Sequence, residues 1–305
     1  MTVRFGFGFK LLPGDDEKYA LILCRSIRKY AGRHKTSPIY AMVPVKYVEE
    51  LNPEFVHEFE KMDISIVPFD YNITNPGVYY MTKSMAAGAA EVYATGKVDQ
   101  LIYLDVESLV LNDPSIMALR TNKKLGIRPV DIQNIGLAWE SPIDDFWANI
   151  YRFLTVTEQD IFPVIASVES IKLKTYLNAC LLTVIPENGL LQKWSANLEK
   201  LHNNPAWNKF FIQDEAYRIF LHQSVMVGTM LAELNEDEYE IYPVQVNFPL
   251  YSYPRHPHKP AWIDELVTCR LDLLNTDNCW KTWLPMREPL KSWLMSQIED
   301  LKLDI

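Results

Sequence analysis

The segment LIYLDVESLV, residues 101–110, constrains the fold more than any other part of the chain. Its first four residues are apolar and bounded by charge, a pattern typical of a short buried strand. Asp105 follows directly, Glu107 lies two positions later, and a second apolar run begins at Leu109. Open α/β sheets bind ligands beyond the carboxyl ends of their strands. The segment therefore predicts two carboxylates at the ligand-binding edge of a sheet.

The spacing of these two acids favours metal binding. Residues two apart in extended backbone point the same way, so Asp105 and Glu107 can place oxygens on one hard divalent cation. The alternative is that both are ordinary surface acids, because such triplets are common in soluble proteins. Asp113 and Pro114 follow the second apolar run and are typical of a helix start. This order of strand, acids, short strand and helix favours the functional interpretation.

Strands and helices alternate along the first 130 residues. The pattern predicts strands at 3–9, 39–43, 64–67 and 101–104, with helices that begin at 15 and extend over 45–61 and 82–93. Such alternation predicts an α/β fold with a mainly parallel central sheet flanked by helices. The second half is less regular: we expect helices over 144–154 and 190–201, a strand over 176–185, and a loop-rich stretch over 243–262.

Composition narrows the partners and the compartment. The formal net charge is −9 and there is no dense basic block, which argues against nucleic acid. An acidic protein that handles an anionic nucleotide needs a local source of positive charge, and a divalent cation is one. The four cysteines are scattered, no uncharged apolar run approaches the ~20 residues of a membrane span, and the start lacks a signal-peptide pattern. We therefore expect a cytoplasmic protein without a transmembrane segment.

Two common phosphate-binding loops are absent from the sequence. Gly6-Phe7-Gly8 begins like a dinucleotide fingerprint, but Leu11 occupies the position of the third glycine. The helix that follows begins with three acids, 15–17, which would repel a pyrophosphate. No GxxxxGK[ST] segment occurs. The phosphates of a nucleotide must be bound in another way.

Several polar residues of the second half interrupt apolar patterns. Asp214, in FFIQDEAYRIFL, is predicted on the apolar face of a helix, where a carboxylate is either paired or directed into a cleft. Asn178 stands in the apolar strand TYLNACLLTV, where the ordinary interpretation is an amide bonded to neighbouring backbone. His256, His258 and Lys259 share the loop PRHPHKPAW. Either histidine can complete a metal site and the lysine can bind phosphate, whereas the alternative is a solvated basic loop.

The order of these motifs resembles that of GT-A-fold glycosyltransferases, and of glycosyltransferase family 8 in particular, over residues 1–262. That family, which includes glycogenin and lipopolysaccharide galactosyltransferases, carries an Asp-x-Asp triplet after a YLD strand, then an Asn-Ala/Ser-Gly strand, a Gln-Asp helix and a late His loop ending in Lys-Pro-Trp. This chain has YLDVESLVLNDP, YLNACLLTV, FIQDEAYRIF and HPHKPAW in the same order.

The resemblance implies a Rossmann-like GT-A domain that transfers a sugar from a nucleotide diphosphate, most simply a UDP-sugar, with retention of configuration. It implies the following roles: Asp105, Glu107 and one of His256 or His258 bind Mn²⁺ or Mg²⁺; Asn178 and Asp214 face the sugar or acceptor as catalytic residues; Lys83 and Lys259 contact the donor; Phe7 and Phe9 lie near the nucleotide base. The acceptor is a carbohydrate, a lipid or a protein, and a homo-oligomer is left open.

This chain departs from the family pattern at three points. Glu107 replaces the second aspartate, Cys180 stands where glycine is usual, and His258 abuts Lys259 without the usual spacer. These departures keep two alternatives open, a sugar-phosphate nucleotidyltransferase and a degenerate sugar-nucleotide-binding protein. The former is disfavoured because GFGFKLLPG lacks a GxGTR-type loop. The expected division is a GT-A-like domain over 1–265 and an extension over 266–305 with an amphipathic helix packed on it.

Overall fold

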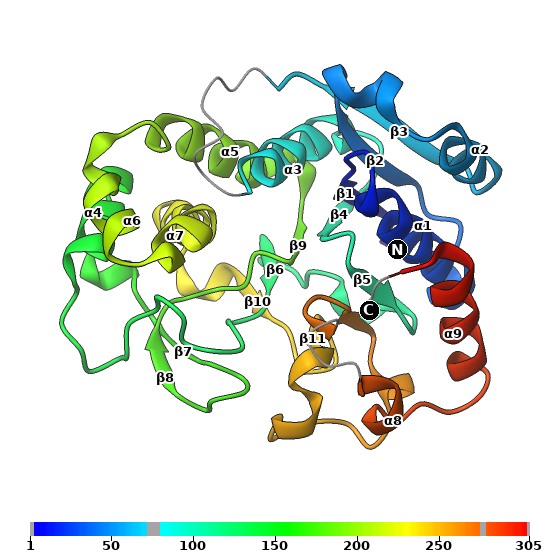
Figure 1. The fold of residues 1–305 in the computed structure, drawn as a ribbon. Coiled ribbons are helices and arrows are strands. Elements are labelled where there is room, and N and C mark those ends of the chain that lie inside the picture. The colour runs from blue at the N-terminus through cyan, green and yellow to red at the C-terminus, as the bar shows by residue number, and fades with distance from the viewer. Residues whose placement is uncertain (1–2, 72–79, 275–278, 304–305) are drawn as a thin grey trace.

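The computed structural model describes residues 3–71, 80–274 and 279–303, and a seven-stranded sheet forms its centre (Figure 1). The strands are β1 (Phe5–Lys10), β2 (Ile39–Pro44), β3 (Ile64–Phe69), β4 (Gln100–Leu104), β6 (Leu125–Ile127), β9 (Leu181–Val184) and β10 (Tyr239–Ile241). Their order is β10-β6-β9-β4-β1-β2-β3, and β9 runs antiparallel to both neighbours while the other pairs are parallel. The expected α/β class with a mainly parallel sheet is confirmed.

The first helices follow the predicted alternation with one correction. They are α1 (Asp15–Tyr30), α2 (Pro53–Lys61) and α3 (Met81–Ala94). The single helix expected over 45–61 is divided into a 3₁₀ segment, Val45–Glu50, and α2. The division has a local cause, because Asn52 accepts a hydrogen bond from the backbone N–H of Glu54 at 2.9 Å and Pro53 occupies the first helical position.

Helices of the second half complete the core on one side of the sheet. They are α4 (Asp145–Leu154), α5 (Leu190–Leu201), α6 (Asn208–Gln213) and α7 (Glu215–Glu233), and α5 packs against α3 and α7 (Figure 1). Trp147 and Trp194 are fully buried there, and each indole N–H donates to a backbone carbonyl. These two large side chains are therefore buried with their polar atoms satisfied.

The glycines of β1 serve packing. A Cβ atom at Gly8 would lie 3.3 Å from the Cβ of Ala90 on α3, and one at Gly6 would lie 3.1 Å from a methyl group of Val98. These contacts are tighter than most in proteins, so glycine lets β1 and α3 approach closely. The GFG segment thus has a structural explanation, in agreement with the rejection of a phosphate-binding loop.

A second sheet ties the late part of the chain to the acidic turn. It contains β5 (Ser108–Val110), β11 (Phe248–Pro249) and β12 (Thr268–Arg270), and β5 and β12 pair antiparallel. A separate hairpin joins β7 (Pro163–Ile165) and β8 (Lys172–Lys174). The boundary expected after residue 265 falls just before β12, so the strand that pairs with β5 belongs to the proposed extension.

The C-terminal helices pack on the domain. They are α8 (Trp280–Trp283) and α9 (Leu290–Leu301), and α9 lies beside α1 (Figure 1). The ring of Trp293 meets that of Tyr30 edge-on at 5.1 Å, and Arg25 donates to the side chain of Gln297 at 2.7 Å. Among the described helices, none has the length and apolar character that a membrane span requires.

Candidate functional site

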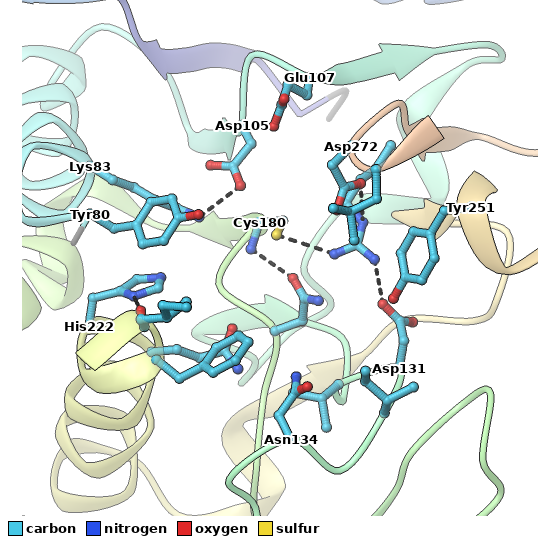
Figure 2. Close-up of a pocket in the computed structure, with 18 residues that line it drawn as sticks. Tyr80, Lys83, Asp105, Glu107, Asp131, Asn134, Cys180, His222, Tyr251 and Asp272 are labelled. Carbon is cyan, nitrogen blue, oxygen red and sulfur yellow. Dashed lines mark hydrogen bonds and ion pairs between the residues drawn. The ribbon is translucent and has the colours of Figure 1, made fainter. Parts of the chain in front are cut away.

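A pocket of about 470 Å³ opens at the carboxyl end of β4 (Figure 2). It is lined from α3, the turn after β4, residues 130–134, the segment before β9, α7 and the segment after β12. The lining includes these residues with polar or ionisable side chains: Tyr80, Lys83, Asp105, Glu107, Asp131, Asn178, Cys180, His222, Arg270 and Asp272. This edge of a mainly parallel sheet is where α/β proteins bind ligands, and the volume lies in the range of small-molecule sites, about 300–1,000 Å³.

Asp105 and Glu107 both line this pocket, although the backbone differs from the prediction. Residues 105–108 form a turn and not an extended segment, because the N–H of Ser108 donates to the carbonyl of Asp105 at 3.1 Å. The N–H of Asp105 in turn donates to the carbonyl of Cys180 at 2.9 Å. The turn is therefore fixed against the segment that leads into β9, and it presents both carboxylates at one edge.

Lys83 pairs with the first of these acids. Its Nζ lies 2.8 Å from Oδ2 of Asp105, and the residue is 5% exposed. Burial alone would lower the pKa of Lys83, but the Asp105 carboxylate outweighs burial and the pKa is raised. Lys83 is therefore a fixed positive charge in the pocket wall.

Glu107 and Asp272 are two acids of the pocket whose charges act on each other. Burial, followed by the charges of Asp272 and Asp105, raises the pKa of Glu107 to about 7. Burial also raises the pKa of Asp272, which the positive charge of Arg270 opposes. Nε of Arg270 lies 3.5 Å from Oδ1 of Asp272, but the geometry makes no hydrogen bond. The acids thus crowd one another around the same part of the pocket.

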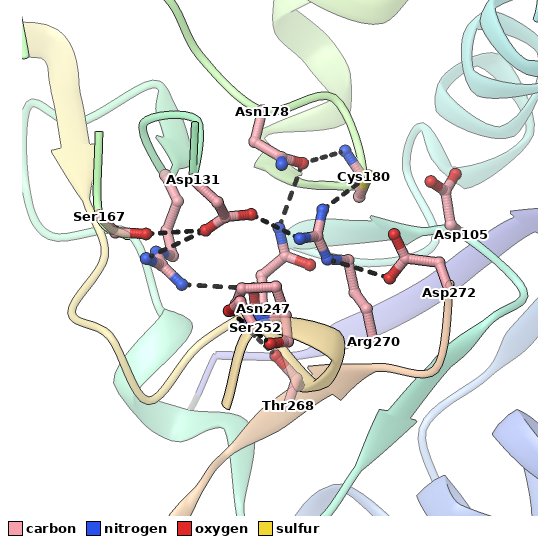
Figure 3. Close-up of polar contacts among 12 residues, drawn as sticks. Asp105, Asp131, Ser167, Asn178, Cys180, Asn247, Ser252, Thr268, Arg270 and Asp272 are labelled. Carbon is pink, nitrogen blue, oxygen red and sulfur yellow. Dashed lines mark hydrogen bonds and ion pairs between the residues drawn. The ribbon is translucent and has the colours of Figure 1, made fainter. Parts of the chain in front are cut away.

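A buried polar network holds Arg270 in place (Figure 3). Nη2 of Arg270 donates a hydrogen bond to Oδ2 of Asp131, and Nη1 lies 3.3 Å from Sγ of Cys180. The other oxygen of Asp131 accepts from Ser167 at 2.8 Å and lies 3.7 Å from Nη2 of Arg128. Because Asp131 joins two buried arginines, its loss would leave charges unpaired in the core.

Asn178 lies at the junction of this network and the pocket. Its Oδ1 accepts from the N–H of Cys180 at 2.8 Å and from the side chain of Asn247 at 3.3 Å (Figure 3). The strand expected over 176–185 is shortened to β9, so Asn178 stands in the segment before it. Asn178 therefore lines the pocket while its amide oxygen accepts two hydrogen bonds.

The histidine loop lies outside the residues that line this pocket. His256 is buried against Phe248, with ring centroids 4.7 Å apart, and its pKa is lowered to about 4 by burial and by Arg128. His258 and Lys259 are exposed, and Nζ of Lys259 donates to the carbonyl of Pro254 at 2.8 Å. The structure therefore does not bring these three residues to Asp105 and Glu107.

Three further residues implied by the resemblance also lie away from the pocket lining. Phe7 and Phe9 are fully buried in the core between the sheet and α1, with no surface for a nucleotide base. Asp214 is exposed in the junction between α6 and α7, where its side chain accepts from the N–H of Ala216 at 2.9 Å. The single helix expected there is wrong, because the chain breaks at Asp214 and begins a new helix with it as the N-cap.

Sequence reasoning missed Tyr80, Asp131, His222, Arg270 and Asp272. One signal was available: TCRLDLL places two charged residues two positions apart within an apolar run, much as the acidic triplet does. His222 lies in the apolar part of α7, where a polar residue also stands out. Asp131 gave less indication, because its hydrogen-bond partners Ser167 and Arg270 are 36 and 139 residues away in the chain.

The donor chemistry of the pocket suits a hard divalent cation. Among the described residues that line it, four carboxylates (Asp105, Glu107, Asp131 and Asp272) face two cations (Lys83 and Arg270), a formal excess of two negative charges. Arg128, behind Asp131, offsets part of this excess. Within the described ranges, no three His, Cys, Asp or Glu side chains converge closely enough to hold a metal by themselves. Mg²⁺ is commonly bound through one or two carboxylates together with substrate phosphates and water. Asp105 and Glu107 fit that arrangement.

Comparison of the whole chain with known proteins gave structural likenesses only. No protein-family model and no curated protein sequence matches it. Similar solved structures include an active-site mutant of LgtC (11% identity, 87% of this chain and 86% of that chain, TM-score 0.49). Another is mouse xyloside xylosyltransferase 1 (11% identity, 89% of this chain and 98% of that chain, TM-score 0.47). A third is the glycosyltransferase GlyE of Streptococcus pneumoniae TIGR4 (14% identity, 99% of this chain and 62% of that chain, TM-score 0.47). These likenesses are loose.

Proposed function

We propose that this protein is a metal-dependent glycosyltransferase that moves a hexose from a nucleotide-diphosphate sugar, a UDP-sugar in the simplest case, to a carbohydrate, lipid or protein acceptor. The observation that carries the proposal is the formal excess of carboxylates over cations in a pocket at the carboxyl end of β4. A diphosphate would be repelled from such a pocket unless a divalent cation accompanied it. The likeness of motif order to glycosyltransferase family 8 supports the same reaction, with retention of configuration.

The roles of the residues follow from their charge. Asp105 and Glu107 would hold Mg²⁺ or Mn²⁺, which when bound supplies positive charge to the diphosphate as the glycosidic bond breaks. Lys83 would add a fixed positive charge beside the oxygens of the diphosphate. Arg270, held by Asp131, would bind a phosphate through the guanidinium edge that now faces only a thiol. Asn178 would orient a sugar hydroxyl.

A titration tests this proposal. UDP is titrated calorimetrically into the wild-type protein and into Asp105→Asn. Each titration is run with about 5 mM Mn²⁺, a saturating concentration for a site completed by phosphate oxygens, and again with a chelator. We expect binding that requires Mn²⁺ in the wild type and loses about tenfold or more in affinity in Asp105→Asn. Asp145→Asn, at an exposed acid of α4, is the matched control and should bind as the wild type does.

The alternatives differ from a glycosyltransferase in this titration or in an assay of sugar release. A sugar-nucleotide-binding protein without turnover would bind UDP with Mn²⁺ but release no sugar from a panel of nucleotide sugars. A nucleotidyltransferase would require a nucleoside triphosphate. Absence of UDP binding, or binding that neither Mn²⁺ nor Asp105 influences, would refute the proposed function.

A further inference from the structure

Tyr80 and His222 lie on one side of the pocket, opposite Asp272 and Tyr251 (Figure 2). Their rings are 4.6 Å apart and inclined by 38°, and Nζ of Lys83 lies 5.8 Å from the Tyr80 ring. Ile219 and Phe220 of α7 line the same side. This side is therefore aromatic and apolar, in contrast to the four carboxylates of the rest of the pocket.

Tyr80 is held in an unfavourable conformation at the pocket mouth. Its backbone adopts φ 61° and ψ 17°, the left-handed region that costs a bulky residue on the order of 1 kcal/mol. The side chain nevertheless remains 52% exposed. An exposed aromatic ring that the fold positions at a cost, and does not bury, points to a ligand that packs on it.

His222 contributes a hydrogen-bond acceptor to the same side. It is 4% exposed, and its Nδ1 lies 2.9 Å from the carbonyl of Ile219, so the ring proton resides on Nδ1. Burial, with the charge of Lys83, lowers the pKa of His222 to about 3 and keeps the imidazole neutral. Nε2 then carries a lone pair, and no described residue donates a hydrogen bond to it. A hydroxyl group suits this atom, whereas a phosphate, which has only acceptors, does not.

We propose that Tyr80 and His222 form a sugar subsite, in which one face of a sugar ring packs on Tyr80 and one hydroxyl donates a hydrogen bond to Nε2 of His222. The C–H groups on a sugar face are weakly positive and the face of an aromatic ring is negative, so the two attract. The sugar belongs either to the donor or to the acceptor, since both present the same groups. The inference rests on the proposed function and specifies how that pocket selects its substrate.

Titration of variants distinguishes these sources. UDP, UDP-glucose and UDP-galactose are titrated with Mn²⁺ into the wild type, Tyr80→Ala, Tyr80→Phe and His222→Phe. If the sugar is the donor's, Tyr80→Ala and His222→Phe should weaken a UDP-sugar about tenfold and leave UDP within about twofold, while Tyr80→Phe restores most of the affinity. Tyr93→Ala, at a half-buried aromatic of the same helix, is the matched control. Unchanged UDP binding also shows that each variant is folded.

The second arm tests the acceptor. Methyl β-glucoside and methyl β-galactoside are titrated into the UDP-saturated wild type and its variants. If the sugar is the acceptor's, Tyr80→Ala and His222→Phe should weaken the binding of these glycosides about tenfold. Equal weakening of UDP and UDP-sugar in the variants, or no loss in either arm, would overturn the sugar subsite. The proposed function would still stand in that case, because the wild type binds UDP with Mn²⁺. If the wild type binds no UDP at all, the proposed function fails and this inference fails with it.

Discussion

Nζ of Lys83 lies 2.8 Å from Oδ2 of Asp105, so a lysine occupies one oxygen of the first acid proposed to bind a divalent cation. Two positive charges near one carboxylate repel each other, and the effect is strong where water is largely excluded. Lys83 would therefore compete with a metal ion at Asp105 in the absence of substrate. A diphosphate would relieve this competition because it brings negative charge to both cations.

Replacement of Lys83 by methionine separates metal binding from donor binding. We expect Lys83→Met to bind Mn²⁺ alone about tenfold more tightly, because a competing positive charge is removed from a buried position. The same variant should bind a UDP-sugar with Mn²⁺ more weakly, because a cation that faces the diphosphate is lost. Mn²⁺ electron paramagnetic resonance and calorimetry measure the two affinities. Lys97→Met, at an exposed lysine that contacts Tyr93, is the control; weaker Mn²⁺ binding by Lys83→Met would contradict the competition.

Asp131 is predicted to be essential for stability through Arg270. Its side chain is 5% exposed and faces two buried arginines. Asp131→Asn keeps the shape but removes the charge, so we expect a loss of about 3 kcal/mol in the free energy of unfolding. Urea denaturation followed by circular dichroism measures it. Asp145→Asn removes an exposed acid that lies 3.4 Å from Lys209 and should cost less than about 0.5 kcal/mol. Similar values for both variants would show that the network contributes little.

The sequence was informative where local pattern determines structure. The apolar run before Asp105 predicted β4 and the edge at which the pocket opens, because burial and strand length are encoded within a few residues. Lys83 and Asn178, to which the family resemblance assigned contacts with the donor and the sugar, also line the pocket, and those roles stay predictions. The break at Asp214 escaped prediction because the apolar spacing continues through it, and only the capping geometry shows that one helix ends and another begins there.

Other parts of the site depend on long-range pairing, which a single sequence does not reveal. Arg270 reaches the pocket because β12 pairs with β5, two strands separated by more than 150 residues. The family resemblance implied that one of His256 or His258 lies there, but the structure buries His256 against Phe248 and leaves both histidines outside the pocket lining. The phenylalanines of β1 alternate with glycines in a pattern that suits either a core strand or a base pocket, and burial in the core decided between them.

Glu91 on α3 should make stability depend on pH. It is fully buried, accepts from the N–H of Gln192 at 2.9 Å, and burial raises its pKa to about 7. The folded state holds the proton more tightly than the unfolded state, so stability is highest below the unfolded pKa of about 4.5 and falls as the pH rises to about 7. The fall for this group is on the order of 3 kcal/mol. Urea unfolding from pH 4 to 8 should show a decline in Glu91→Gln that is smaller than in the wild type by about 3 kcal/mol. Glu107, whose pKa is also raised to about 7, keeps its own part of the decline, and Glu50→Gln, at an exposed acid, should decline as the wild type does. A parallel decline in Glu91→Gln and wild type would exclude Glu91 as its source.

Asp214 provides a test that separates the structure from the motif resemblance. In the structure its Oδ1 accepts from the N–H of Ala216 at 2.9 Å, and the exposed side chain lies outside the pocket lining. Asp214→Ala should therefore cost about 1 kcal/mol of stability, as the loss of a helix cap does, and Asp214→Ser should recover most of it. Because Asp214 does not line the pocket, the affinity for UDP with Mn²⁺ and the rate of sugar release from a UDP-sugar should match the wild type in both variants. A large loss of sugar release in Asp214→Ser, with stability retained, would instead favour the catalytic role that the Gln-Asp motif implies.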